Sequence, residues 1–124
     1  MMASQQGNTC VTLLKVIEIR QYIGPGDKNY FEEWFNQLNA QAAAKVSTAL
    51  ARISCGNWSN VKGVGSSVYE YRINFGPGYR IYFGKEGDRI VILLAGGSKQ
   101  RQQQDIENAH ERWSAYKNAR KAAK

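Results

Sequence analysis

The sequence predicts an α+β domain that combines an antiparallel sheet of about four strands with an N-terminal helical hairpin and a C-terminal helix. Three observations predict it: a β-branched run near the N-terminus, two apolar stripes at helical spacing, and a meander with two tight turns. The 124 residues fit one compact core. We expect a flexible leader over 1–9, a single domain over 10–120 and a basic tail over 121–124.

The strands are predicted from residue type and from the turns between them. Val11–Arg20 is rich in β-branched residues, which favour strands. The meander has strands at Val68–Phe75, Tyr79–Gly84 and Arg89–Ala95. Its turns are Gly76-Pro77-Gly78 and Glu86-Gly87-Asp88, sequences typical of chain reversals. The last strand is almost continuously apolar, so we expect it to lie centrally in the sheet.

The helices are predicted from capping residues and periodic apolar positions. Asn29 is a candidate N-cap, with Glu32 three residues later, and Gly56 is placed to end the second helix. The two stripes, separated by a turn near Asn39, comprise Phe31, Trp34, Phe35 and Leu38, then Ala42, Val46, Ala49, Leu50 and Ile53. Such periodic residues are typical of core, and we expect both helices to lie over the sheet. A final helix over 99–119, capped by Ser98, has sparse apolar positions at Ile106, Ala109, Trp113 and Tyr116.

The composition favours a polyanionic partner. Seventeen Lys and Arg against ten Asp and Glu give a net charge of +7, which favours nucleic acid or an acidic protein segment, although such a charge also serves solubility. Cys10 and Cys55 lack metal-ligand spacing and are expected to be reduced thiols. We expect no metal and no cofactor. Without a hydrophobic signal core or a membrane-spanning run, the expected location is the cytoplasm.

Cations gather on one face of the predicted meander. Period-two alternation places Arg72 beside Glu70, and Arg80 beside Tyr82, on the face opposite the aromatic positions. Lys62 precedes the meander and Lys99 follows it. Rigidly held cations next to aromatic rings suit a phosphate backbone.

Each of these cations also has a purely structural interpretation. Arg72 could pair with Glu70 or Glu86 across the sheet, and Arg80 could stack on Tyr82 or bond the turn. Lys62 and Lys99 could be ordinary solvated lysines. The single histidine, His110, fits a packing role on the final helix better than a catalytic one.

Several segments together resemble the RelE/ParE superfamily of bacterial toxins, and more narrowly its HigB-like addiction module killer branch. The segments are FEEWFNQL at 31–38, VKGVGSSVYEYRI at 61–73, GPGYRIYF at 76–83 and LLAGGSKQRQQQDIENA at 93–109. The resemblance implies a RelE-like fold, with an antiparallel sheet covered on one side by helices. It also implies the toxin of a type II toxin–antitoxin system, whose antitoxin partner often carries a helix-turn-helix domain.

The activity that the resemblance implies is metal-independent cleavage of mRNA on the ribosome, in which the 2′-hydroxyl attacks the adjacent phosphate. Carried over residue by residue, Arg72, Arg80 and Lys99 are the expected catalytic residues, and Lys62, Tyr82 and Arg101 the expected RNA-binding ones. The general acid and base stay unassigned. Two alternatives stay open: a ParE-like gyrase inhibitor, and a non-catalytic module that binds nucleic acid or antitoxin.

Overall fold

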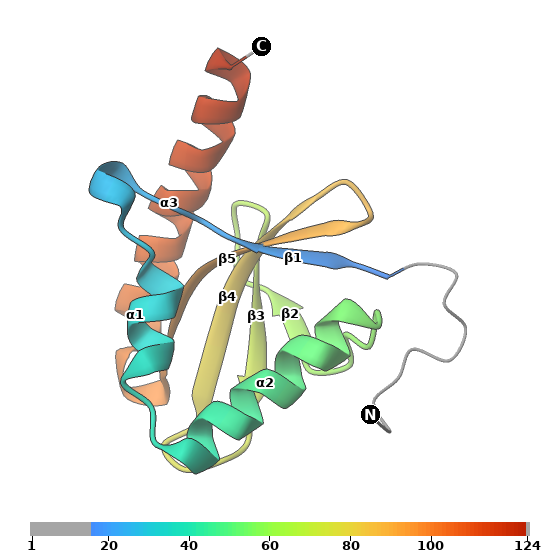
Figure 1. Ribbon diagram of the computed structural model, residues 1–124, viewed down its shortest axis with the longest axis vertical. Helices are drawn as coiled ribbons and strands as arrows, with labels where there is room; N and C mark the ends of the chain where they lie inside the picture. The colour runs from blue at the N-terminus through green and yellow to red at the C-terminus, as the bar shows by residue number, and fades with distance from the viewer. Residues whose placement is uncertain (1–15, 124) are drawn as a thin grey trace.

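The computed structural model, which describes residues 16–123, contains one five-stranded mixed sheet (Figure 1). Across the sheet the strand order is β1-β5-β4-β3-β2. The bounds are β1 Glu18–Gln21, β2 Val61–Gly63, β3 Val68–Ile73, β4 Tyr79–Glu86 and β5 Ile90–Ser98. Strands β2 to β5 pair antiparallel, whereas β1 pairs parallel to β5. The predicted α+β class is confirmed.

The predicted sheet is wrong in two details. It has five strands, because Val61–Gly63 pairs with β3 as an additional strand. This strand was not predicted because three residues are too few to show an alternating pattern. The sheet is also not purely antiparallel, because β1 runs parallel to β5. The sequence could not predict this, since a strand's own residues do not specify the direction of its partner. In the first strand, Val11–Lys15 lie outside the described residues, and pairing begins only at Glu18.

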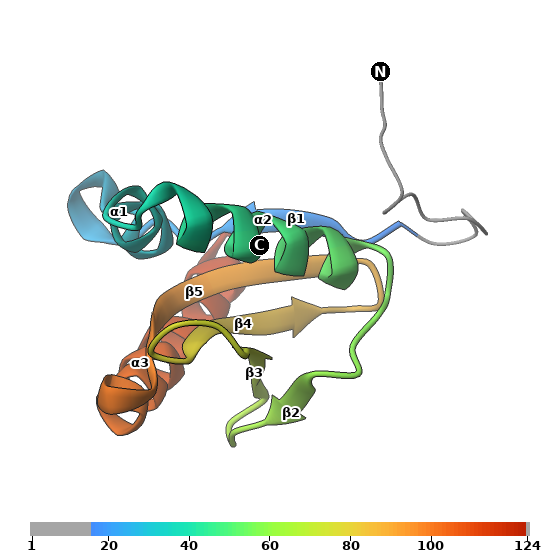
Figure 2. The same ribbon diagram turned by 90° about the horizontal axis from the view of Figure 1, so that it is seen from below.

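Helices cover both faces of the sheet. Helices α1 (Tyr30–Asn36) and α2 (Ala40–Ser54) lie over one face, and α3 (Gln102–Ala122) lies over the other (Figure 2). Two 3-10 helices, η2 (Pro25–Asp27) and η3 (Lys99–Arg101), precede α1 and α3. The predicted hairpin on one face is confirmed. The expectation that helices cover only one side of the sheet is wrong.

The predicted start of α1 is confirmed, whereas that of the last helix is not. The Asn29 side chain accepts a hydrogen bond from the Glu32 amide at 3.0 Å, and Asn39 caps α2 in the same way. Ser98 makes no side-chain capping bond. The chain instead passes through η3, so α3 begins at Gln102.

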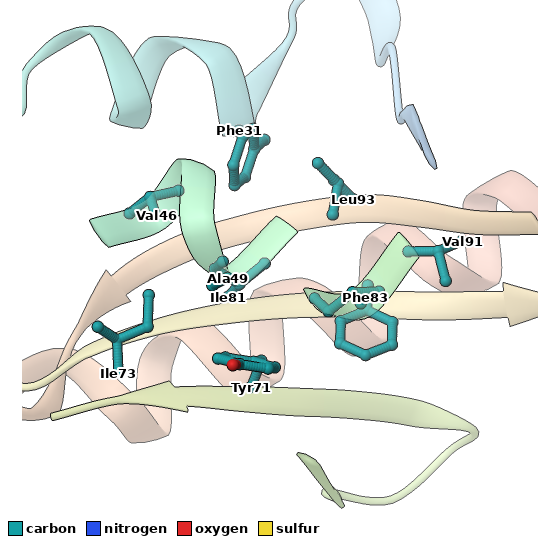
Figure 3. Close-up of a cluster of buried hydrophobic side chains, with 10 residues drawn as sticks. Phe31, Val46, Ala49, Tyr71, Ile73, Ile81, Phe83, Val91 and Leu93 are labelled. Carbon is teal, nitrogen blue, oxygen red and sulfur yellow. The ribbon is translucent and has the colours of Figure 1, made fainter. Parts of the chain in front are cut away.

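Two hydrophobic clusters hold these layers together. The first joins α1 and α2 to the sheet (Figure 3), and its buried members are Phe31, Val46, Ala49, Ile53, Tyr71, Ile73, Ile81, Phe83, Val91 and Leu93. The second joins α3 to the other face through Val68, Tyr82, Ile92, Leu94, Ala95, Ala109 and Trp113. Both predicted stripes therefore contribute to the core, as do the sparse apolar positions of the last helix.

The cysteine expectation is wrong for Cys55, which is disulfide-bonded rather than reduced. Cys10 lies outside the described residues. Spacing along the chain predicts metal sites far better than it predicts disulfides between distant elements. Within residues 16–123, no helix is long and apolar enough to cross a membrane.

Candidate nucleic-acid interface

A basic groove lies where α2 meets the edge of the sheet at β2 and β3. It consists of two adjoining hollows of about 230 and 260 Å3 that share Asn60, Arg72 and Asn74. We call this the basic groove and define it by its four cations: Lys45, Arg52, Lys62 and Arg72. Among the described residues that line it there is no Asp or Glu, so its charged side chains are all cationic.

The local structure explains why these cations face solvent together. Lys45 and Arg52 lie on α2 beside its buried stripe, and all four cations are exposed. Lys45 Nζ lies 5.3 Å from the centre of the Phe75 ring. The Arg72 amide donates to Asn60 O at 3.2 Å, which holds the end of β3 against the segment before β2. Rigid elements therefore carry the cations from both sides of the groove.

Two of the groove residues were predicted from sequence and two were missed. The sequence predicts a functional role for Lys62 and Arg72, whereas Lys45 and Arg52 emerge only from the structure. A signal was present: Lys45, Thr48 and Arg52 follow i, i+3 and i+7 spacing, so they share one helix face. The proposed pairing of Arg72 with Glu70 or Glu86 is wrong, because within the described part of the chain no ion pair involves Arg72.

Arg80 and Tyr82 do not belong to this open surface, contrary to the sequence-based expectation. Their side of the sheet is covered by α3, which leaves Arg80 only 5% exposed and Tyr82 fully buried. Both contact the fully buried carboxylate of Glu70. Tyr82 Oη donates to it at 3.0 Å, and Arg80 Nε lies 3.6 Å from Glu70 Oε2. Alternation along the strands placed these residues on the correct face but could not show that α3 covers it.

Glu70 links the buried cluster to the basic groove. Lys62 Nζ, whose side chain is half-exposed, lies 3.8 Å from Glu70 Oε1, and Gln102 Nε2 donates to Glu70 Oε2 at 2.9 Å. Burial, followed by the charge of Glu70, raises the pKa of Tyr82, so its hydroxyl stays protonated. Arg80 also donates from Nη1 to Gly78 O at 2.9 Å, which confirms the alternative that it bonds the turn. Arg80 is thus held between Glu70 and the turn and has little exposed surface.

Lys99 and Arg101 lie on η3 and line neither hollow of the basic groove. Lys99 is exposed beside the β3–β4 turn, where its amide donates to Pro77 O at 3.4 Å. Arg101 lines a different hollow, next to α1. The structure therefore brings Lys62 and Arg72 together, buries Arg80 and Tyr82, and separates Arg101 from both groups.

His110 has a packing role, as the sequence indicated. Its Nε2 lies 2.9 Å from Val64 O, and its ring is close to Gly65, so it joins α3 to the loop after β2. It does not line the basic groove. The described residues of the groove thus offer cations and amides for phosphate binding, with no imidazole or carboxylate for proton transfer.

Comparison with known proteins gives a family for this chain. Residues 33–114 match the family described as phage derived protein Gp49-like (DUF891). The chain belongs to the Gp49-like family. This family is related to toxin–antitoxin systems of the RelE/HigB kind. An uncharacterized protein of Haemophilus influenzae is 39% identical to this chain over 80 residues, which cover 64% of this chain and 81% of the relative.

The Gp49-like region contains all the site residues that the sequence predicts. It begins inside α1 and ends inside α3, so it includes the basic groove, the Glu70 cluster and η3. The antitoxin partner implied by the sequence is therefore consistent with the family, and so is a toxin–antitoxin role.

Proposed function

We propose that this protein is the toxin of a type II toxin–antitoxin system and that it is a metal-independent, ribosome-dependent mRNA endoribonuclease. The single observation that carries the proposal is the basic groove, in which four exposed cations from three elements line two adjoining hollows that lack acids among their described residues. Membership in a toxin–antitoxin-related family supports the same role. A phosphodiester backbone is the polyanion that such a channel fits.

The proposed reaction uses a nucleophile from the substrate. The 2′-hydroxyl oxygen attacks the adjacent phosphorus while the bond from phosphorus to the 5′-oxygen breaks. The products are a 2′,3′-cyclic phosphate and a free 5′-hydroxyl, and one proton moves from the attacking to the leaving oxygen. The protein's main contribution is to stabilise the negative charge that develops on the phosphoryl oxygens.

Arg72 and Lys62 are the residues that we propose for this charge stabilisation. Both line the same hollow, and the planar guanidinium of Arg72 can donate to two phosphoryl oxygens at once. Glu70, held by Arg80, Tyr82 and Gln102, restrains the Lys62 ammonium from the buried side of the sheet. Arg80 and Tyr82 are thus positioning residues in this proposal, because they act through Glu70.

Fewer side chains are available for proton transfer than for charge stabilisation. His110 is bonded to Val64 O and lies outside the groove. We propose Lys62 for proton transfer, because it lines the same hollow as Arg72, and exposed Lys99 as a phosphate contact on the approach. The groove has no imidazole or carboxylate among its described residues, so the ribosome would have to supply further groups for proton transfer. Ribosome dependence fits this need.

The test is the mapping of mRNA 5′ ends by primer extension after brief induction. We expect new ends within translated frames for the wild type, and their loss in Arg72→Ala. The matched control is Arg89→Ala, which removes the same charge from an exposed position next to β5, outside the groove. New ends that persist unchanged in Arg72→Ala would refute the assigned role. Growth arrest without new ends would favour a gyrase-directed or purely binding toxin.

The proposed antitoxin partner follows from the same charges. We propose that its acidic segment neutralises the net charge of +7, with the basic groove as one contact. Binding should then weaken as salt rises from low to physiological concentration. Equal dissociation constants at low and high salt would contradict this part of the proposal.

A further inference from the structure

A second hollow, separate from the basic groove, lies between α1, the end of β5 and the start of α3. Its volume is about 330 Å3, within the range of small-ligand sites. Residues 95–98 of β5 line it together with side chains of α1, η3 and α3, which are Tyr30, Trp34, Gln37, Arg101, Asp105, Asn108 and Arg112. We call this the Asp105 hollow.

Asp105 is the unusual group in this hollow, because it is a buried carboxylate with unused hydrogen-bonding capacity. The residue is 7% exposed, and its Oδ2 has no hydrogen-bond partner. The nearest cation to Oδ1 is Arg101 Nε, at 4.0 Å, which is beyond hydrogen-bond distance. Burial raises the pKa of Asp105, against the opposing charges of Arg101 and Arg112. A ligand that donates hydrogen bonds would satisfy this group.

The remaining walls carry two aromatic rings, two guanidinium groups and the side-chain amides of Gln37 and Asn108. The indole of Trp34 lies directly on Gly96, where an added Cβ would overlap it. The guanidinium of Arg112 lies 3.6 Å from the centre of the Tyr30 ring, and its Nη1 donates to Leu94 O at 3.0 Å. Arg101, with a side chain 65% exposed, stands at the rim. The hollow thus offers planar surfaces, one inner acceptor and one outer cation.

These features together select a class of ligand. A lysine or arginine from a partner protein would meet two guanidinium groups, whereas a simple anion would meet the carboxylate. A nucleotide fits both: its base stacks on a flat ring, its N–H groups donate to Asp105, and its phosphate lies near Arg101. Guanine presents adjacent ring N–H and amino donors, and either of them can donate to the Asp105 Oδ1 that faces Arg101, while Oδ2 lies against Gly97.

The two sites lie close enough for one RNA strand to contact both. Gly97, at the base of the Asp105 hollow, pairs with Arg80 on β4, and Arg80 pairs with Arg72 on β3. Gly97 and Arg72 therefore lie in one row, two strand spacings or about 10 Å apart. Lys99 lies on η3, which directly follows β5.

We propose that the Asp105 hollow binds an unpaired guanine of the RNA whose backbone lies in the basic groove. The inference rests on the proposed function and deepens it, since it assigns a base-reading residue to a backbone-binding surface. Asp105 reads the base by accepting its donors, and Trp34 supplies the stacking surface.

The experiment measures binding by fluorescence anisotropy with labelled 2′-O-methyl hexanucleotides, which lack the attacking hydroxyl and cannot be cleaved by this reaction. One probe is all-uridine and the other carries a single guanosine. We expect the full chain to bind the guanosine probe about tenfold more tightly. Asp105→Asn should remove that preference and leave the uridine affinity unchanged. The matched control is Glu107→Gln, an exposed position on the same helix.

The outcomes separate this inference from the proposed nuclease activity. Equal affinity of the wild type for both probes, or a preference that survives in Asp105→Asn, would overturn the guanine site. A preference lost in Asp105→Asn supports the site even if the induced protein produces no new mRNA ends, which would defeat the nuclease proposal alone. A melting temperature of Asp105→Asn at or above that of the wild type shows that the variant is folded.

Discussion

Arg80→Met should destabilise the protein strongly, although the residue is a cation on a sheet that was expected to bind RNA. Arg80 is 5% exposed, and its partner Glu70 is fully buried. The substitution leaves that carboxylate without its buried counter-charge. Removing one member of a buried pair typically costs about 3–5 kcal/mol, because the other charge stays desolvated.

The magnitude can be worked from the geometry. With an effective dielectric constant of about 20, two charges 3.6 Å apart attract by about 5 kcal/mol. Tyr82 and Gln102 continue to donate hydrogen bonds to Glu70, and Lys62 stays 3.8 Å from it. We therefore expect the lower end of the range, a loss of about 3 kcal/mol in the free energy of unfolding.

The assay is urea denaturation followed by tryptophan fluorescence, with Arg72→Met as the matched control. Arg72 is exposed, so its loss should change stability by less than about 0.5 kcal/mol. In the double variant with Glu70→Gln, the cost of Arg80→Met should fall by more than about 1 kcal/mol. A single Arg80→Met variant that loses less than about 1 kcal/mol would refute the reasoning, and so would strictly additive effects of the two substitutions.

Three further predictions concern other parts of the molecule. Gly84→Ala should cost about 1–3 kcal/mol in urea denaturation, since the new methyl group would overlap the Trp113 indole; an unchanged midpoint would contradict that packing. Asp105→Asn should be more stable than the wild type at neutral pH, because burial raises the pKa of Asp105 and wild-type stability is lost as pH rises through it; the difference should vanish below about pH 3.8, and a constant difference would argue against the buried charge. Lys45→Ala and Arg52→Ala should each reduce the slope of log affinity for single-stranded RNA against log salt by about 0.7, and an unchanged slope would remove that residue from the groove.

Local patterns in the sequence predicted the fold well where neighbouring residues decide the structure. The cap at Asn29, the stripe on α2 and the turns of the meander are short-range features. The errors arose where distant segments decide. Strand β2 exists because β3 offers it a partner, and β1 is parallel because the chain crosses the sheet before pairing with β5.

The candidate site shows the same contrast between features set by neighbouring residues and features set by distant segments. Alternation placed Arg72 and Arg80 on one face of the sheet, yet only the position of α3 decides that Arg80 is buried and Arg72 exposed. Glu70 stands out in the sequence as the single acid in the group, but its four contacts come from strands β2 and β4 and from helix α3. Lys45 and Arg52 could have been found from helical spacing, whereas the Asp105 hollow needs three elements in place.

The pairing of β1 with β5 also bears on the order in which the protein acquires its structure during synthesis. Glu18 pairs with Ile90, about 70 residues further along the chain, so β1 stays without its partner until β5 has emerged. The cations of the groove all lie between Lys45 and Arg72 and can assemble earlier. Glu70, which restrains Lys62, waits longer for Arg80 and Gln102. A nascent chain would therefore carry positive charge well before it carries an ordered site, and the proposed toxin activity would arise only after most of the domain has been translated.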